Sequence, residues 1–166
     1  MEFLDKNTIK LDKVKTELDK FTFDFCKILE KHTNYVVISG YVSILFGRAR
    51  ATEDVDLFIE ILDKSNFDLL YEDLRKNNFN CITAGKHDAY KNLKLNIAIR
   101  FAKGDNFIPN MEIKFAKKPN DKISLTNNIK VVTPFGHIYT SRIEQQIAYK
   151  RAVLKSDKDI EDALHL

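Results

Sequence analysis

The sequence predicts a protein of the α/β class (α+β in its arrangement), with a mixed β-sheet flanked by helices. Two observations support this prediction. Apolar residues recur at helical spacing near the N-terminus, and β-branched runs without alternation, typical of buried central strands, follow at residues 35–38 and 55–61. The chain of 166 residues contains no repeat and no long linker, so residues 1–166 are expected to form a single domain.

An amphipathic helix is predicted at the N-terminus. Its apolar stripe, spaced alternately three and four residues apart, consists of Leu11, Val14, Leu18, Phe21, Phe25 and Ile28. The pair Ser39-Gly40 then breaks a short strand. The elements predicted from there to the middle of the chain are a strand over 35–38, a short helix over 41–46, a strand over 55–61 and a helix that begins at Ser65, with Asp68 in a capping-box position, and ends at Asn77.

The second half is predicted to contain strands followed by a pair of helices. Strands are expected over 79–83, 95–101 and 111–115, and residues 123–132 are expected to form a small hairpin or an irregular crossing. Ser141 and Glu144 form a capping box that predicts a helix to about Lys155. A last short helix is predicted over 159–164, which completes a C-terminal helical pair.

The composition excludes several classes of protein. With 44% apolar and 31% charged residues, the chain is not expected to be disordered, and no apolar stretch approaches the roughly 20 residues that cross a bilayer. Charged residues at positions 2, 5 and 6 interrupt any secretion signal, so we expect a cytoplasmic protein without a membrane partner. Cys26 and Cys81 are too few for a disulfide scaffold and lack zinc-binding spacing.

The net charge of +3 conceals an uneven distribution of charge along the chain. Residues 53–73 contain eight acidic residues and one lysine, whereas residues 86–130 contain ten basic residues and four acidic ones. Such a pair of segments suits a site that holds a metal cation beside a polyanionic substrate. Two solvated faces would produce the same pattern.

Asp54 and Asp56 are the first candidate metal ligands. Residues two apart in a strand share a face, so both carboxylates project together from the start of the strand over 55–61. Two close carboxylates repel unless a cation lies between them, and Mg²⁺ prefers such hard oxygen ligands. Gly40, between a strand and a helix, lacks a Cβ and would let a phosphate approach the backbone amides.

These residues and their surroundings resemble the signature of the nucleotidyltransferase superfamily that includes DNA polymerase beta. The resemblance lies in Val37-Ile38-Ser39-Gly40, in the run from Arg50 to Leu57 (Arg-Ala-Thr-Glu-Asp-Val-Asp-Leu), in residues 143–150 and in Lys158-Asp159-Ile160-Glu161-Asp162. It is strongest toward small prokaryotic members, including the AbiEii type of toxin–antitoxin nucleotidyltransferase. Ser39 departs from the family pattern, which usually has a glycine at that position.

The resemblance implies an enzyme that transfers a nucleoside monophosphate from an NTP to an acceptor hydroxyl. It implies a third carboxylate on a neighbouring strand, for which Glu112 fits best and Asp88 and Glu60 fit less well. Asp54, Asp56 and Glu112 would be the catalytic and metal-binding residues, with Mg²⁺ as the cofactor and Mn²⁺ as its alternative. The residues implied in nucleotide or phosphate binding are Ser39, Gly40, Arg48, Arg50, Thr52 and Lys150. Lys150, which interrupts an apolar helical stripe, would either reach the surface or point into the cleft.

The acceptor and two other functions stay open at this point. The acceptor could be the 3′ end of an RNA, a protein or a small molecule, and a cognate antitoxin is a further candidate partner. A non-catalytic member of the same fold that binds RNA or a protein would also use the basic segment 86–130. A Mg²⁺-dependent nuclease would use Glu112-Ile113-Lys114 together with an upstream aspartate such as Asp88.

Overall fold

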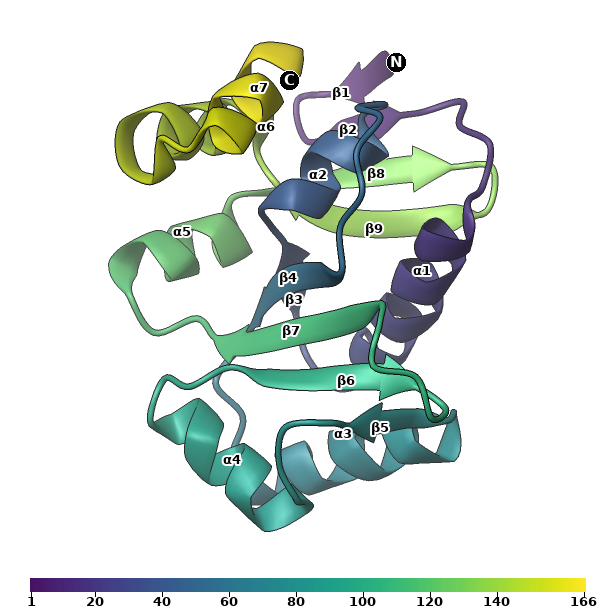
Figure 1. The fold of residues 1–166 in the computed structure, drawn as a ribbon, viewed down its shortest axis with the longest axis vertical. Helices are drawn as coiled ribbons and strands as arrows, with labels where there is room; N and C mark the ends of the chain where they lie inside the picture. The colour runs from purple at the N-terminus through teal and green to yellow at the C-terminus, as the bar shows by residue number, and fades with distance from the viewer.

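The computed structural model describes residues 1–166, which fold around one nine-stranded sheet (Figure 1). The strand order is β1-β2-β8-β9-β3-β4-β7-β6-β5. The pairs β2/β8, β3/β9 and β4/β7 are parallel and the other pairs are antiparallel, which confirms the prediction of a mixed sheet. The strands are β1 (Glu2–Asp5), β2 (Thr8–Lys10), β3 (Tyr35–Val37), β4 (Asp54–Ile59), β5 (Phe79–Cys81), β6 (Ile99–Lys103), β7 (Asn110–Phe115), β8 (Asn128–Thr133) and β9 (Gly136–Ser141).

Seven helices and one wider turn of π type accompany the sheet, and none of the helices has the length and apolar character needed to cross a membrane. They are α1 (Glu17–Leu29), α2 (Gly40–Leu45), α3 (Lys64–Lys76), α4 (Lys86–Lys94), α5 (Pro119–Thr126), α6 (Ile143–Tyr149), the π turn η1 (Lys150–Leu154) and α7 (Asp157–His165). The C-terminal pair α6 and α7 is present as predicted, and α7 lies beside α2 (Figure 1).

The main core fills one face of the sheet, beneath α1, α3 and α4. Phe25 of α1 packs edge-on against Phe79, and Tyr71 of α3 packs against Phe101. A small second core of Val36, Ala116 and Leu125 lies between the opposite face and α5. The rest of that opposite face, over β4, β7 and β6, is available for polar side chains.

The N-terminal helix begins later than its apolar stripe predicts. Thr16 and Asp19 form a capping box, so α1 starts at Glu17. Leu11 instead extends the sheet, since its N–H donates to the carbonyl of Val132 at 2.8 Å, and Val14 is exposed. The two strands before the helix were not predicted, because each is short and half-polar.

Other helix boundaries also differ from the sequence prediction. Helix α3 is capped by Asp63 rather than Ser65. Ser141 belongs to β9 and does not cap α6, because its hydroxyl accepts a hydrogen bond from the Gln146 side chain within the sheet–helix junction.

The middle of the chain contains two helices that were not predicted. Helix α4 buries only Ala89 and Leu93, and α5 buries only Ser124 and Leu125, so neither shows a clear apolar stripe. The strand expected at 95–101 begins at Ile99. The hairpin expected within 123–132 lies later, between β8 and β9.

Candidate active site

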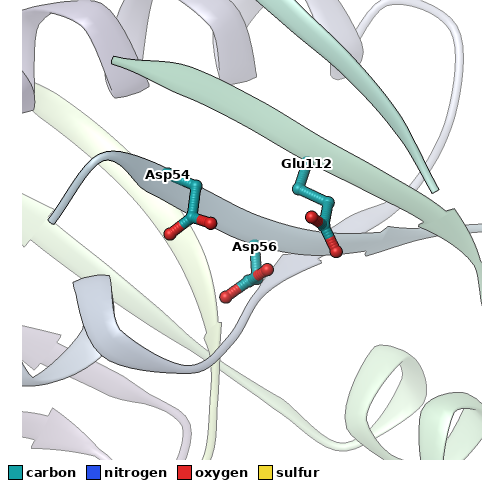
Figure 2. Close-up of side chains that lie close together, drawn as sticks. All are labelled: Asp54, Asp56 and Glu112. Carbon is teal, nitrogen blue, oxygen red and sulfur yellow. The ribbon is translucent and has the colours of Figure 1, made fainter. Parts of the chain in front are cut away.

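Three carboxylates meet on the open face of the sheet. Asp54 and Asp56 project from β4, and Glu112 projects from β7 toward the same space (Figure 2). The parallel register pairs Asp56 directly with Glu112. Because directly paired residues share a face, the three side chains converge, and each offers an oxygen within 4.8 Å of the others.

The charges on these carboxylates are compensated unequally. Burial, followed by the neighbouring Glu112 and Asp54, raises the pKa of Asp56 above its ordinary value. Burial alone would also raise the pKa of Glu112, but hydrogen bonds from Lys114 (2.7 Å) and from Arg100 (2.6 Å to Nη2) hold it below the ordinary value. Glu112 is therefore held as an anion, whereas Asp54 and Asp56 have no cationic partner within 4.0 Å.

This donor set suits a hard divalent cation. Asp54 and Asp56 have no counter-charge, and Glu112 lies at hydrogen-bonding distance from two cations. The three carboxylates therefore leave net negative charge facing one point. Oxygen ligands of this kind are preferred by Mg²⁺ and Mn²⁺. Asp54, Asp56 and Glu112 are the residues that would hold such an ion.

The segment between β3 and α2 is a tight turn. Ser39 has φ 64° and ψ −140°, a conformation that favours glycine, so this residue is strained. A Cβ on Gly40 would lie 3.0 Å from two guanidinium nitrogens of Arg50. The glycine therefore permits the close approach of Arg50.

A polar pocket of about 260 Å³ connects this turn with the carboxylates. No apolar side chain lines it. Its lining residues are Ser39, Gly40, Arg50, Thr52, Asp54, Asp56, Lys150, Ser156, Lys158 and Asp159. A pocket without an apolar wall suits a charged, hydrogen-bonding group such as a phosphate chain rather than an aromatic base.

The basic side of the pocket is organised by Asp162 of α7. This carboxylate is completely buried and bonds to Lys150 at 2.8 Å and to Arg50 at 2.7 Å. Arg48 donates to the same carboxylate and to Glu161. Burial alone would raise the pKa of Asp162, but the hydrogen bonds from Lys150 and Arg48 hold it below its ordinary value.

Comparison with solved structures identifies the fold. An antigenic nucleotidyltransferase-like protein from Paracoccidioides brasiliensis superposes with a TM-score of 0.58 and 16% identity, over 88% of this chain and 72% of that one. The lincomycin-bound lincosamide antibiotic adenylyltransferase LnuA superposes with a TM-score of 0.54 and 14% identity, over 90% of this chain and 95% of that one. The chain has the nucleotidyltransferase fold. No protein-family profile and no curated protein sequence matches it, so the narrower resemblance to the AbiEii type stays a prediction.

Within this nucleotidyltransferase fold, most residues singled out in the sequence lie together. Among the residues expected to bind nucleotide or phosphate, Arg48 is the exception, since it does not line the pocket and its guanidinium faces Asp162 and Glu161. Lys150 does not reach the surface: its side chain is 1% exposed and lines the pocket. Glu60 is bonded to Asn34, and Asp88 lies on α4, so neither joins the carboxylates.

Arg100 and Asp162 are among the site residues for which the sequence predicted no role. The alternation in β6 would place Arg100 on the face opposite to Phe101, but only the pairing with β7 brings it to Glu112. Asp162 ends the Lys-Asp-x-x-Asp run, which indicated a resemblance but no role. A larger depression of about 480 Å³ lies at the other end of β3, and none of the predicted site residues except the excluded Glu60 lines it.

Proposed function

We propose that this protein is a metal-dependent nucleotidyltransferase, which transfers a nucleoside monophosphate from an NTP to an acceptor hydroxyl. The observation that carries the proposal is the direct junction of the carboxylates of Asp54 and Asp56 with a polar pocket that contains Arg50 and Lys150. The pocket offers cations and backbone amides on one side, which suit the phosphates of a metal–triphosphate complex. It offers uncompensated carboxylates on the other side, which suit the metal.

One set of residues would bind the phosphates, and a second set would hold the metal ion. Arg50, Lys150 and the turn at Ser39-Gly40 would bind the phosphates, with Thr52 beside Asp54. Asp54, Asp56 and Glu112 would hold Mg²⁺ or Mn²⁺, which would neutralise phosphate charge and favour the ionised acceptor hydroxyl. The acceptor oxygen bonds to the α-phosphorus as the bond to pyrophosphate breaks, and the hydroxyl proton passes to a carboxylate of the cluster.

The sequence resemblance alone supports, as proposals, a prokaryotic enzyme and a role in a toxin–antitoxin pair with a cognate antitoxin. Transfer of a nucleoside monophosphate to a hydroxyl follows the same chemistry for each candidate acceptor. The candidates are therefore an RNA 3′ end, a protein side chain and a small molecule. The nuclease alternative is less well supported, because Asp88 lies away from Glu112.

The test is a labelling assay with each of the four α-³²P-labelled NTPs, Mg²⁺ and total cellular RNA, with wild type beside Asp54→Ala and Asp56→Ala. We expect label to enter an acceptor with the wild type only. Shortened, unlabelled RNA would favour the nuclease. Magnesium-independent RNA binding without transfer would favour the non-catalytic module.

A further inference from the structure

Arg100 and Lys114 flank Glu112 and retain unused hydrogen-bond donors. Arg100 bonds to Glu112 through Nε and Nη2, which leaves Nη1 without a partner. Lys114 uses its Nζ for the other oxygen of the same carboxylate, and the two basic side chains are 43% and 40% exposed. Both cations can therefore contact a ligand while they hold Glu112.

The order of the strands places these cations on one defined side of the site. Across the sheet, the turn after β3 comes first, then Asp54 and Asp56 on β4, then Glu112 on β7 and Arg100 on β6. The phosphate pocket lies on the β3 side. In the proposed reaction the acceptor attacks opposite the leaving pyrophosphate, so a nucleotide bound in this pocket would leave the β6 side to the acceptor.

Further basic side chains continue beyond the end of β7, which runs toward the side of the molecule where α4 and α5 lie (Figure 1). We define the β7 basic strip as Lys91, Lys94, Lys117, Lys118 and Lys122. At the end of β7, Nζ of Lys117 donates to the main-chain carbonyl of Lys94 at the end of α4, and Lys118 and Lys122 follow at the start of α5.

The strip is not neutralised within the protein. No carboxylate lies within 4.0 Å of any of its five ammonium groups, whereas Lys86 on the same helix α4 is paired with Glu72 at 2.9 Å. All five are exposed except Lys117, which is half-buried. A row of unpaired lysines attracts a polyanion.

Building on the proposed function, we propose that the acceptor is the 3′ end of a single-stranded RNA. Its terminal hydroxyl lies at Glu112, the nearest phosphate contacts Arg100 and Lys114, and the backbone continues along the β7 basic strip. The positive charge of this surface would repel a cationic small molecule. A protein side chain would contact only Arg100 and Lys114 and would not extend along the β7 basic strip.

The first experiment measures RNA binding without any nucleotide. A fluorescent single-stranded RNA is titrated with wild type, with Lys118→Glu/Lys122→Glu and with the matched control Lys20→Glu/Lys27→Glu, whose exposed lysines lie on α1. Both double variants change the net charge by the same amount. We expect the strip variant alone to bind about tenfold more weakly and to lower the slope of log K against log salt by about 1.4. Equal effects of both variants, or no effect, would overturn the proposal.

The second experiment uses the same proteins in the labelling assay, with RNA as the varied substrate. We expect label in RNA, with KM for RNA raised in the strip variant and kcat little changed at saturating RNA. Label in a protein or small molecule instead of RNA would overturn this inference and leave the proposed function intact. Absence of label from every acceptor would contradict the transfer itself, and the binding experiment would still decide whether the strip holds RNA.

Discussion

Lys150 and Asp162 form an ion pair that is hidden from solvent, with side-chain exposures of 1% and 0% and an Nζ–Oδ2 distance of 2.8 Å. The same carboxylate receives Arg48 and Arg50 from the segment before β4. Helix α7 therefore supplies the counter-charge for cations from two other parts of the chain. Removal of one partner from such a cluster leaves buried charge without compensation.

Asp162→Asn is expected to lower the free energy of unfolding by about 3–5 kcal/mol, because three cations lose a buried counter-ion. Urea denaturation measures this change. Glu161→Gln is the matched control, since Glu161 is 66% exposed and bonds to the same Arg48; it is expected to cost less than about 1 kcal/mol. Similar losses in the two variants would contradict the central role of Asp162.

Asp19 is expected to make stability depend on pH. Burial would raise its pKa, but hydrogen bonds from Lys13 (2.6 Å), Thr16 and Tyr41 (2.8 Å) hold it below the ordinary value of 3.8. The stabilisation is therefore complete above that value and is lost as the pH falls below it. Urea denaturation should show Asp19→Asn destabilised at pH 7, with a smaller difference from wild type at pH 3. Asp12→Asn, at an exposed position, should differ little at either pH.

Ser39→Gly is expected to raise the free energy of unfolding by about 1 kcal/mol, because glycine adopts the observed φ of 64° without strain. Ser39→Ala removes the same hydroxyl and keeps the strain, so it should not stabilise the protein. Thermal unfolding of both variants separates the two effects. A gain in stability for the alanine variant would show that the hydroxyl, and not the backbone, is unfavourable.

Asp56→Asn is expected to stabilise the metal-free protein, since burial and the neighbouring carboxylates raise the pKa of Asp56 and make its charged form costly. Wild-type stability should accordingly fall as the pH rises through this pKa. Mg²⁺ or Mn²⁺ should raise the melting temperature of the wild type but not of Asp54→Asn or Asp56→Asn. Glu53→Gln, next to the cluster but exposed, should respond to metal like the wild type.

Gly40→Ala is expected to reduce nucleotide transfer by about tenfold or more, because the new methyl group would lie 3.0 Å from the Arg50 guanidinium and displace it from the pocket. Fluorescence binding of an NTP and the labelling assay both report this loss. Gly85→Ala is the control, since nothing lies within 4 Å of a Cβ there. Undiminished transfer in the Gly40 variant would exclude Arg50 from phosphate binding.

Local alternation was sufficient to place Asp54 and Asp56 together, and the family resemblance added Glu112 as the third carboxylate. The alternation in β4 places Asp54 and Asp56 on one face, and the alternation in β7 places Glu112 opposite to Met111 and Ile113. The register that pairs Asp56 with Glu112 is a long-range property, but any parallel pairing of these short strands in phase brings the carboxylates close.

Long-range charge pairing was the part that the sequence could not predict. Arg100 reaches Glu112 only because β6 pairs with β7, and Asp162 reaches Arg48 only after the sheet and α7 have packed. The π turn at residues 150–154 is a second case: it inserts an extra residue, so Leu154 leaves the apolar stripe and is exposed while Lys150 stays buried.

The separation of Arg48 and Asp162 by 114 positions has a consequence for biosynthesis. A nascent chain on the ribosome already contains the acidic strand β4 and its neighbouring arginines when Lys150 and α7 have not yet been made. Since domains fold as their segments emerge, the polar pocket is completed only after residues 150–162 have been made. A translation product that stops before α7 therefore contains the acidic ligands but lacks the carboxylate of Asp162, to which Arg48, Arg50 and Lys150 bond in the folded protein.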